Sequence, residues 1–195
     1  MYNKKMLTNF YEDLSSSEIK RISKKTVLIF PFSSIEQHGS HLPINTDKKI
    51  LEGILSEFNN KFSSKKYLIM PQIYIGSASE HKSYDGTLSL NSVDFIKYSI
   101  KIIEQLCKKK FKNIFLLNSH GGQISHLDII GKELKAKYDV TIVKGTYFLF
   151  DDFKGIISRK EKEYGYHGGE FETSLMLYLF PELVNLDKLT SYKYS

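Results

Sequence analysis

The feature that most constrains the fold of this chain is a series of four short apolar segments spaced along its length. They are TVLIF, YLIMPQI, NIFLLN and VTIVKG, which begin at residues 26, 67, 113 and 140. Short apolar runs of this kind predict buried β-strands, and three of the four are rich in β-branched residues or phenylalanine. None alternates cleanly between apolar and polar residues, which is typical of strands covered on both faces. We therefore expect a parallel sheet.

Amphipathic helical patterns lie between these segments and after the last one. Their apolar residues recur at helical spacing over residues 50–58, 92–107, 127–134 and 170–180. Asn91 and Ser92 are candidate N-terminal caps for the second pattern, and the lysines that follow Cys107 are typical of a helix end. Strands that alternate with helices favour a layered α/β fold. The least regular stretch, residues 151–169, is interpreted as a long functional loop.

The composition is that of one globular domain. The chain has 195 residues, of which 41% are hydrophobic and 26% charged, and we expect a single domain over residues 1–195. Its one cysteine, Cys107, lies in a helical apolar pattern, which favours a buried structural thiol and a reducing compartment. The N-terminus lacks an apolar signal segment and no run reaches membrane-spanning length. These features predict a cytoplasmic protein without a membrane partner.

The net charge of +6 raises the question of nucleic-acid binding. Arginine occurs only at Arg21 and Arg159, and the lysines are scattered along the whole chain. Recognition of phosphates and bases relies on arginine and on clustered basic stripes. We therefore interpret the charge as a solvated lysine-rich surface and expect no nucleic-acid partner.

Three polar clusters follow the predicted strands. SIEQHGSHLPINTD begins at residue 34, GSASEHKSYDGT at residue 76 and NSHGGQ at residue 118. In open parallel sheets, ligands bind outside the carboxyl ends of the strands. The coincidence of polar clusters with strand ends is therefore the main structural indication of a functional site.

The residue types in these clusters favour a metal site. Glu36 and His38 share one side of an extended segment, and Asp47 can return to the same point after the intervening turn. His120 stands beside paired glycines, and Glu172 lies in the first turn of the last predicted helix. This mixed nitrogen and oxygen set suits one or two ions of zinc, manganese or iron. Hydrolysis by a metal-activated hydroxide is the default chemistry of such a site.

Other polar residues have simpler interpretations. His41 can pack or cap without a direct role. Glu80 and His81 can form a local ion pair of little consequence, and His126 is expected to be an exposed or half-buried helix residue. These interpretations leave the five candidate ligands as the main set.

The same polar clusters carry a family resemblance. SSIEQHGSHLPINTD, GSASEHKSYDGTLSL, LNSHGGQ and YHGGEFETS resemble, in this order, the four signature blocks of the creatininase (creatinine amidohydrolase) family. The resemblance runs from about Asn9 to about Leu183. It implies a three-layer α/β/α sandwich with a mostly parallel central sheet, two divalent metal ions, amidohydrolase activity and commonly a homohexamer.

The resemblance also implies a role for each candidate ligand. Glu36, Asp47 and His120 match the ligands of one metal. His38, Asp47 and Glu172 match those of the other, so that Asp47 bridges the two ions. Glu172 is also expected to be one of the catalytic residues, together with His167.

Five further residues match positions around the metals. His167 matches the residue that transfers a proton to the leaving nitrogen. Gly121 and Gly122 would line the site with their backbone, and Glu80 and His81 would contact substrate. The family pattern is altered at Ser33 and Ser40 and in NSHGGQ, all next to ligands, which affects the expected shape of the substrate site more than metal binding.

The resemblance narrows the substrate only in part. Creatininase has a ligand glutamate two residues after the histidine that matches His120, and tryptophans over its substrate; this chain has Gly122 there and no tryptophan. Creatinine is therefore not the expected substrate. The HGG form resembles a mycofactocin-type peptide-maturation peptidase and a formamide hydrolase of flavin or deazaflavin synthesis, and a peptide end or small amide or lactam is favoured. Two alternatives are a catalytically inactive metal-binding scaffold and a metal-dependent phosphoesterase.

Overall fold

The fold is built on one four-stranded parallel sheet. A computed structural model describes residues 8–62, 64, 66–165 and 167–189. The strands are β1 (Val27–Phe32), β2 (Tyr67–Ile69), β3 (Asn113–Asn118) and β4 (Thr141–Thr146). Their order across the sheet is β2-β1-β3-β4, and every neighbouring pair is parallel. The predicted parallel sheet is confirmed, and its strands end at one common edge.

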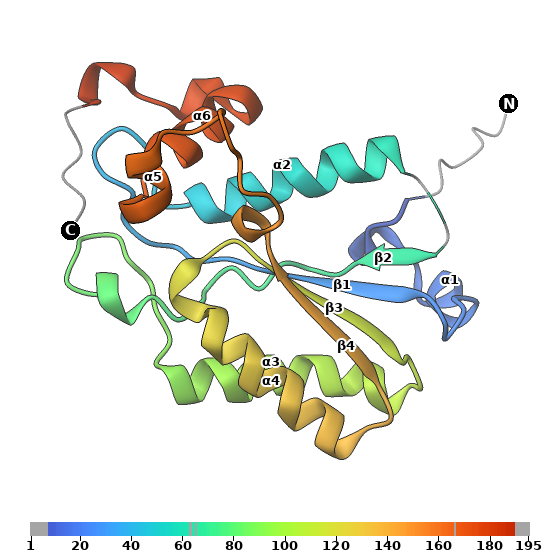
Figure 1. Ribbon diagram of the computed structural model, residues 1–195. Coiled ribbons are helices and arrows are strands. Elements are labelled where there is room, and N and C mark those ends of the chain that lie inside the picture. The colour runs from blue at the N-terminus through green and yellow to red at the C-terminus, as the bar shows by residue number, and fades with distance from the viewer. Residues whose placement is uncertain (1–7, 63, 65, 166, 190–195) are drawn as a thin grey trace, which may run out of the picture.

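Helices cover both faces of this sheet (Figure 1). The four longer ones are α2 (Thr46–Lys61), α3 (Ser92–Lys108), α4 (Ile124–Lys137) and α6 (Glu170–Leu179). In Figure 1, α2 and α6 lie on one side of the sheet and α3 and α4 on the other. The shorter helices are α1 (Ser16–Lys20) and α5 (Arg159–Tyr164), and single 3-10 turns span Tyr11–Asp13, Ser79–His81, Gly121–Gln123, Tyr147–Leu149, Pro181–Leu183 and Leu186–Lys188. The expected three-layer α/β/α sandwich is therefore confirmed.

Alternate residues of β1 supply the two halves of the core. Leu28, Phe30 and Phe32 belong to a buried cluster with residues of α3 and α4, whereas Ile29 belongs to a second cluster with Leu51 of α2. Because side chains of a strand point alternately to the two faces, an uninterrupted apolar run can serve both layers. The apolar sequence of β1 thus fixes its place in the middle of the sandwich.

The predicted cap of the longest helix is confirmed. The Oδ1 atom of Asn91 accepts a hydrogen bond from the backbone N–H of Asp94 at 3.0 Å, which satisfies one of the free donors at the start of α3. At the other end, α3 stops at Lys108, within the lysine-rich segment. Cys107 is buried, as expected of a structural thiol.

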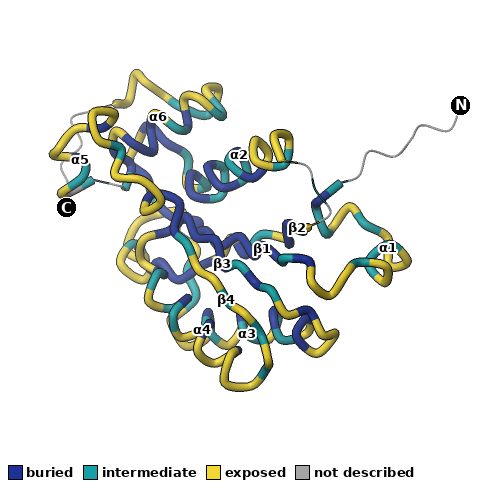
Figure 2. The backbone as a smooth tube through the Cα atoms, turned by 45° about the vertical axis from the view of Figure 1, so that its right-hand side comes forward, coloured by how far each residue is buried: buried dark blue, intermediate teal, exposed yellow. Residues whose placement is uncertain are grey.

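Three expectations are corrected. The edge strand β4 is not covered on both faces. Val143 is 56% exposed, and Figure 2 shows much of this strand as exposed. β2 is shorter than its apolar run, because the chain after Ile69 leaves the sheet and returns only for a single bridge between Phe32 and Ile73. The stretch 151–169 is not loop throughout, since it contains α5.

Among the described residues, no helix is long and apolar enough to cross a membrane.

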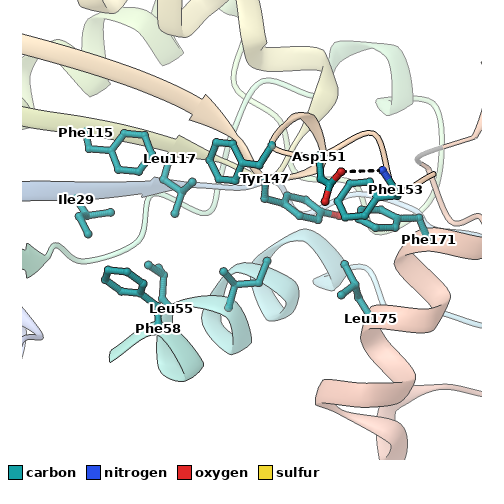
Figure 3. A pocket seen from close by; sticks show the side chains of 12 residues that line it. Ile29, Leu55, Phe58, Phe115, Leu117, Tyr147, Asp151, Phe153, Phe171 and Leu175 are labelled. Carbon is teal, nitrogen blue, oxygen red and sulfur yellow. Dashed lines mark hydrogen bonds between the residues drawn. The ribbon is translucent and has the colours of Figure 1, made fainter. Parts of the chain in front are cut away.

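An apolar cavity lies between the sheet and α2, and residues of α6 and of the segment after β4 complete its lining (Figure 3). Its volume is about 420 Å³. Its lining includes Leu55 and Phe58 of α2, Leu117 of β3, and Phe171 and Leu175 of α6. We call this space the apolar cavity.

Candidate metal centre

The segment after β1 buries two candidate ligands at the carboxyl edge of the sheet. Glu36 and His38 are both fully buried. The Nδ1 atom of His38 lies 3.0 Å from the backbone oxygen of Glu36. Because a carbonyl oxygen can only accept, this contact places the ring proton on Nδ1. The Nε2 atom is thereby left with its lone pair directed into the site, as in metal-binding histidines.

His120 is held in a similar way just after β3. Asn118, the last residue of that strand, accepts the backbone N–H of His120 at 3.2 Å and donates to its backbone oxygen at 2.7 Å. The Nε2 atom of the ring lies 3.2 Å from the backbone oxygen of Ser77. The ring proton therefore belongs on Nε2, and the lone pair of Nδ1 faces the site.

Two carboxylates reach the site from helix N-termini. Asp47 is the second residue of α2 and Glu172 the third residue of α6, and both are buried. The start of a helix favours negative charge, because its backbone N–H groups are unpaired there. The Ser119 hydroxyl donates to the backbone oxygen of Asp47 at 3.0 Å, and the Gly168 N–H donates to Glu172 Oε2 at 2.6 Å. The first bond ties the start of α2 to the end of β3, and the second fixes the Glu172 carboxylate at the start of α6.

The first group of candidate ligands consists of Glu36, Asp47 and His120. Each offers one ligand atom, and these atoms lie within 4.8 Å of one another. Glu36 Oε1 is 2.8 Å and Asp47 Oδ2 is 3.4 Å from the Nδ1 atom of His120. The structure thus brings together the three residues that the family resemblance assigned to one metal.

The second group surrounds His38. Its Nε2 atom lies 3.5 Å from Asp47 Oδ1 and 3.5 Å from Glu172 Oε2. His38, His167 and Glu172 also offer atoms within 4.8 Å of one another. Asp47 therefore turns one carboxylate oxygen toward each group, which is the arrangement that a bridging ligand requires.

The unsatisfied polar atoms of the site fit a cation. The Oε2 atom of Glu36 is buried without a hydrogen-bond partner among the described residues, and Glu36 Oε1, His38 Nε2 and Asp47 Oδ2 meet only other residues of the site. Buried polar atoms without partners destabilise a fold. Imidazole nitrogens and carboxylate oxygens are donors that zinc, manganese and iron accept. The residues present therefore fit one or two divalent ions.

The shifted pKa values of the site residues indicate that positive charge is favoured between the carboxylates. Burial, with the Asp47 carboxylate, raises the pKa of Glu36 to about 7 despite the opposing His120 ring. Burial alone would lower the pKa of His38, but the charges of Glu172 and Asp47 raise it well above its ordinary value. Burial would raise the pKa of Asp47, yet the neighbouring imidazoles lower it. Protons thus occupy positions that metal ions would otherwise take.

His167 lies at the open side of the site. It is partly exposed, and its Nδ1 atom lies 3.7 Å from Glu36 Oε1. Its ring stacks on His81 with centroids 4.1 Å apart and lies 4.4 Å from the ring of His38. Burial, reinforced by the charges of His38 and His81, lowers the pKa of His167 to about 3. The ring is therefore neutral at neutral pH.

Sequence reasoning gave no role to Gln37, which orients His167. The Oε1 atom of Gln37 accepts the backbone N–H of Gly39 at 2.9 Å, so its amide nitrogen must face the other way. That nitrogen lies 2.9 Å from Nε2 of His167. Gln37 thus donates to Nε2 and leaves the ring proton on Nδ1. The available signal was the position of Gln37 between two candidate ligands.

The remaining predicted residues separate into two sets. Glu80 and Gly122 lie against His120, and His81 stacks on His167, so these three adjoin the metal groups. Glu80 contacts His120 in place of the local ion pair with His81 that was considered.

Gly121 and His41 lie further from the ligand atoms. A Cβ atom on Gly121 would meet only Phe148, at 3.9 Å. His41 is buried, and its Nε2 atom lies 2.9 Å from the Thr173 hydroxyl, which agrees with a packing role. His126 is half-buried on α4, as expected.

These features define an α/β/α protein with a candidate metal centre of nitrogen and oxygen donors at the carboxyl edge of its sheet. The chain matches the family model described as creatininase, creatinine amidohydrolase, over residues 12–194. The chain belongs to the creatininase family, as its sequence blocks indicated.

Two curated relatives agree with this assignment. Creatinine amidohydrolase of Pseudomonas putida is 29% identical over 183 residues, which cover 85% of this chain and 69% of the relative. A mycofactocin precursor peptide peptidase of Mycobacterium ulcerans (strain Agy99) is 24% identical over 170 residues, which cover 84% of this chain and 62% of the relative. The chain thus spans about two thirds of the length of these relatives.

Solved structures give the same result. A mutant creatininase aligns with a TM-score of 0.81 and 26% identity over 95% of this chain and 78% of that chain. A zinc–zinc form of another mutant creatininase (TM-score 0.78, covering 95% and 78%) and a manganese form of creatininase (0.76, covering 96% and 79%) are each 25% identical. Together the comparisons support a hydrolase that acts on carbon–nitrogen bonds and binds divalent metal.

Proposed function

We propose that this protein is a metal-dependent amidohydrolase that cleaves the carbon–nitrogen bond of a small amide, a lactam or a peptide end. The observation that carries the proposal is the position of Asp47, whose two carboxylate oxygens face two separate ligand groups. Glu36, Asp47 and His120 would hold one ion, and His38, Asp47 and Glu172 the other. The Oε2 atom of Glu36, which is buried without a hydrogen-bond partner among the described residues, supports this assignment.

A bound pair of such ions supplies Lewis acidity at a carbonyl and a nucleophile at neutral pH. The protein contributes the rest of the reaction. His38 and His120 are fixed with the correct nitrogens facing inward, since backbone oxygens accept from their other nitrogens. Because the ligand residues are buried, electrostatic contacts with a bound substrate would be stronger there than in water.

We propose His167 as the residue that moves the proton. Its ring lies at the open side of the site, beside Glu36, where it could give a proton to the departing nitrogen. This role needs a pKa near the working pH, so the pKa of about 3 in the metal-free protein would have to rise in the loaded, substrate-bound protein. Gln37 holds Nε2 of the ring, which leaves Nδ1 toward Glu36. The His81 ring stacks on the His167 ring and supports it.

The substrate proposal rests on what surrounds the metal groups. Position 122 is glycine and the chain has no tryptophan, so the features that favour creatinine in creatininase are missing. The similarity to a mycofactocin precursor peptide peptidase favours a peptide end. A formamide is the next candidate of the same reaction class. A homo-oligomer, a cytoplasmic location and a single domain over residues 1–195 stay predictions.

The test is hydrolysis by zinc- and manganese-loaded protein of a panel of peptides, lactams, formamides and phosphate monoesters. We expect release of amine from at least one amide class, with loss of about a hundredfold or more in His167→Ala. His126→Ala, a half-buried histidine outside the ligand groups, is the matched control and should keep its activity. Turnover of phosphate esters alone would favour the phosphoesterase, and tight metal binding without any turnover would favour the scaffold.

A further inference from the structure

A carboxylate lies on the outer side of the His120 ring. Glu80 belongs to the 3-10 turn Ser79–His81, and its Oε1 atom lies 3.2 Å from Nε2 of His120. This nitrogen is the one that faces away from Glu36 and Asp47. The Glu80 side chain is 43% exposed, so it closes the site from the solvent side without being part of the core.

Position 122 leaves room for this carboxylate. A Cβ atom on Gly122 would lie 1.7 Å from Glu80 Oε1 and 2.7 Å from Nε2 of His120. Any side chain there would have to displace the carboxylate or the ring. The contact between Glu80 and His120 therefore depends on glycine at position 122.

The groups around Nε2 of His120 determine which nitrogen of the ring carries the proton. Nε2 of His120 has two oxygen neighbours, the backbone oxygen of Ser77 and the Glu80 carboxylate, each at 3.2 Å. Both can only accept, so the ring proton is held on Nε2 and the lone pair stays on Nδ1. A carboxylate behind a ligating imidazole raises the basicity of the ligand nitrogen and fixes the ring.

We propose that Glu80 is a positioning residue for the metal centre, which acts through His120, and that Gly122 is required to admit it. This role is additional to the substrate contact that the sequence suggested for Glu80, which stays a prediction. It rests on the proposed metal centre, in which Nδ1 of His120 binds the ion beside Glu36.

The test compares zinc affinity in Glu80→Gln, Gly122→Ala and the control Glu57→Gln, in which an exposed glutamate of α2 is changed in the same way. Affinity is measured by competition with a chelating dye, and the cobalt-substituted proteins are compared by visible absorption. Glu80→Gln should weaken one of the ions by about tenfold to hundredfold and change the cobalt spectrum. The melting temperature of the metal-free protein is measured beside the zinc affinity, because Glu80 also pairs with His120 there, and the loss of zinc affinity should exceed the loss of metal-free stability.

Gly122→Ala reaches the same contact from the other side. Its methyl group should expel the carboxylate and weaken zinc binding at least as much as Glu80→Gln. Wild-type affinity and spectrum in Glu80→Gln, or an equal loss in Glu57→Gln, would overturn the role of Glu80 and leave the metal centre intact. If wild-type protein binds no zinc, cobalt or manganese, both the centre and this inference fail.

Discussion

The metal centre and the apolar cavity both include residues of α2 and α6, but the centre is formed by histidines and carboxylates and the cavity mainly by apolar side chains. α2 places Asp47 in the centre and Leu55 on the cavity, two turns further along. α6 places Glu172 in the centre and Leu175 on the cavity. In each helix the ligand carboxylate lies in the first turn, whereas the cavity is lined from later turns of α2 and, in α6, from Phe171 as well as Leu175.

One helix can therefore supply a metal ligand at its start and apolar packing along its length. The first turn has free N–H groups that favour a carboxylate, whereas the middle of the helix has its backbone bonds satisfied and packs by apolar contact. Changes to the ligand carboxylates should therefore affect metal binding, and changes to the apolar residues of the cavity should affect stability. The following predictions test this separation.

The largest effect is expected for Asp47→Asn. The neutral amide keeps the shape of the side chain but cannot bridge two cations, so metal content should fall from about two ions per chain to one or none, with loss of hydrolysis. Mass spectrometry of the purified protein measures this. Asp151→Asn, at the rim of the apolar cavity, is the control and should retain both ions. Full metal content in Asp47→Asn would contradict the bridging role.

The second prediction concerns the other end of α2. Leu55 is 4% exposed, and Leu55→Ala should lower the free energy of unfolding by about 2 to 3 kcal/mol, because it enlarges a space that is already partly empty. Urea denaturation measures this change. Leu149→Ala, which alters a 63% exposed leucine, should change stability by less than about 0.5 kcal/mol. Zinc content should stay at the wild-type value in both variants, and a parallel loss of zinc in Leu55→Ala would refute the separation.

The third prediction uses pH to separate the two regions. Folding raises the pKa of Glu36 from 4.5 to about 7, and the pKa values of His38 and His120 lie well above 6.5. Glu36 therefore contributes a fall in stability between about pH 4.5 and 7. Above pH 6.5 the two histidines keep protons that the unfolded chain loses, so the stability of the metal-free protein should go on falling as pH rises above about 7, by up to about 1.4 kcal/mol per pH unit for each such histidine. Melting curves in chelator measure this.

Zinc provides the complement to that experiment. Metal displaces the same protons, so the stabilisation by zinc should be larger at pH 8.5 than at pH 7. The cost of Leu55→Ala should be equal at the two pH values, because Leu55 is not in contact with the titrating groups. A metal-free protein that gains stability over this range would contradict the proton assignment.

The smallest effect is expected where the two regions meet. Tyr147 lines the apolar cavity, and its hydroxyl is buried without a hydrogen-bond partner among the described residues. Tyr147→Phe should therefore change the free energy of unfolding by less than about 1 kcal/mol, with either sign. Tyr138→Phe is a useful contrast, because the Tyr138 hydroxyl donates to Glu104 at 3.2 Å and its loss should destabilise. A loss above about 2 kcal/mol in Tyr147→Phe would indicate that its hydroxyl supports the metal centre.

The two regions also differ in how far the sequence predicts them. Glu36, His38 and Asp47 stood out because charged residues and histidines collect after an apolar run, where a parallel sheet binds ligands. The apolar cavity had no such signal. Leu55 and Phe171 are ordinary core residue types, and only their packing distances decide whether they touch or leave a space.

Local geometry sets the same limit elsewhere. The segment around Val143 resembles a buried strand in sequence, yet Val143 is 56% exposed, because in this edge strand it points to the face opposite Ile142, which packs against the core. The contact between Glu80 and His120 joins residues from different loops, and the sequence alone gave no reason to pair them. Residue types were predictable; the partners of their side chains depended on three-dimensional positions.

The wide separation of the ligands along the chain has a consequence for folding kinetics. Glu36 follows β1, His120 follows β3, and Glu172 begins α6. Their ligand atoms can meet only after distant parts of the chain have come together, which is the slow step in folds with many non-local contacts. A metal ion should therefore bind late and cannot nucleate folding as zinc does in small finger domains. Metal uptake would then report the completion of the native fold.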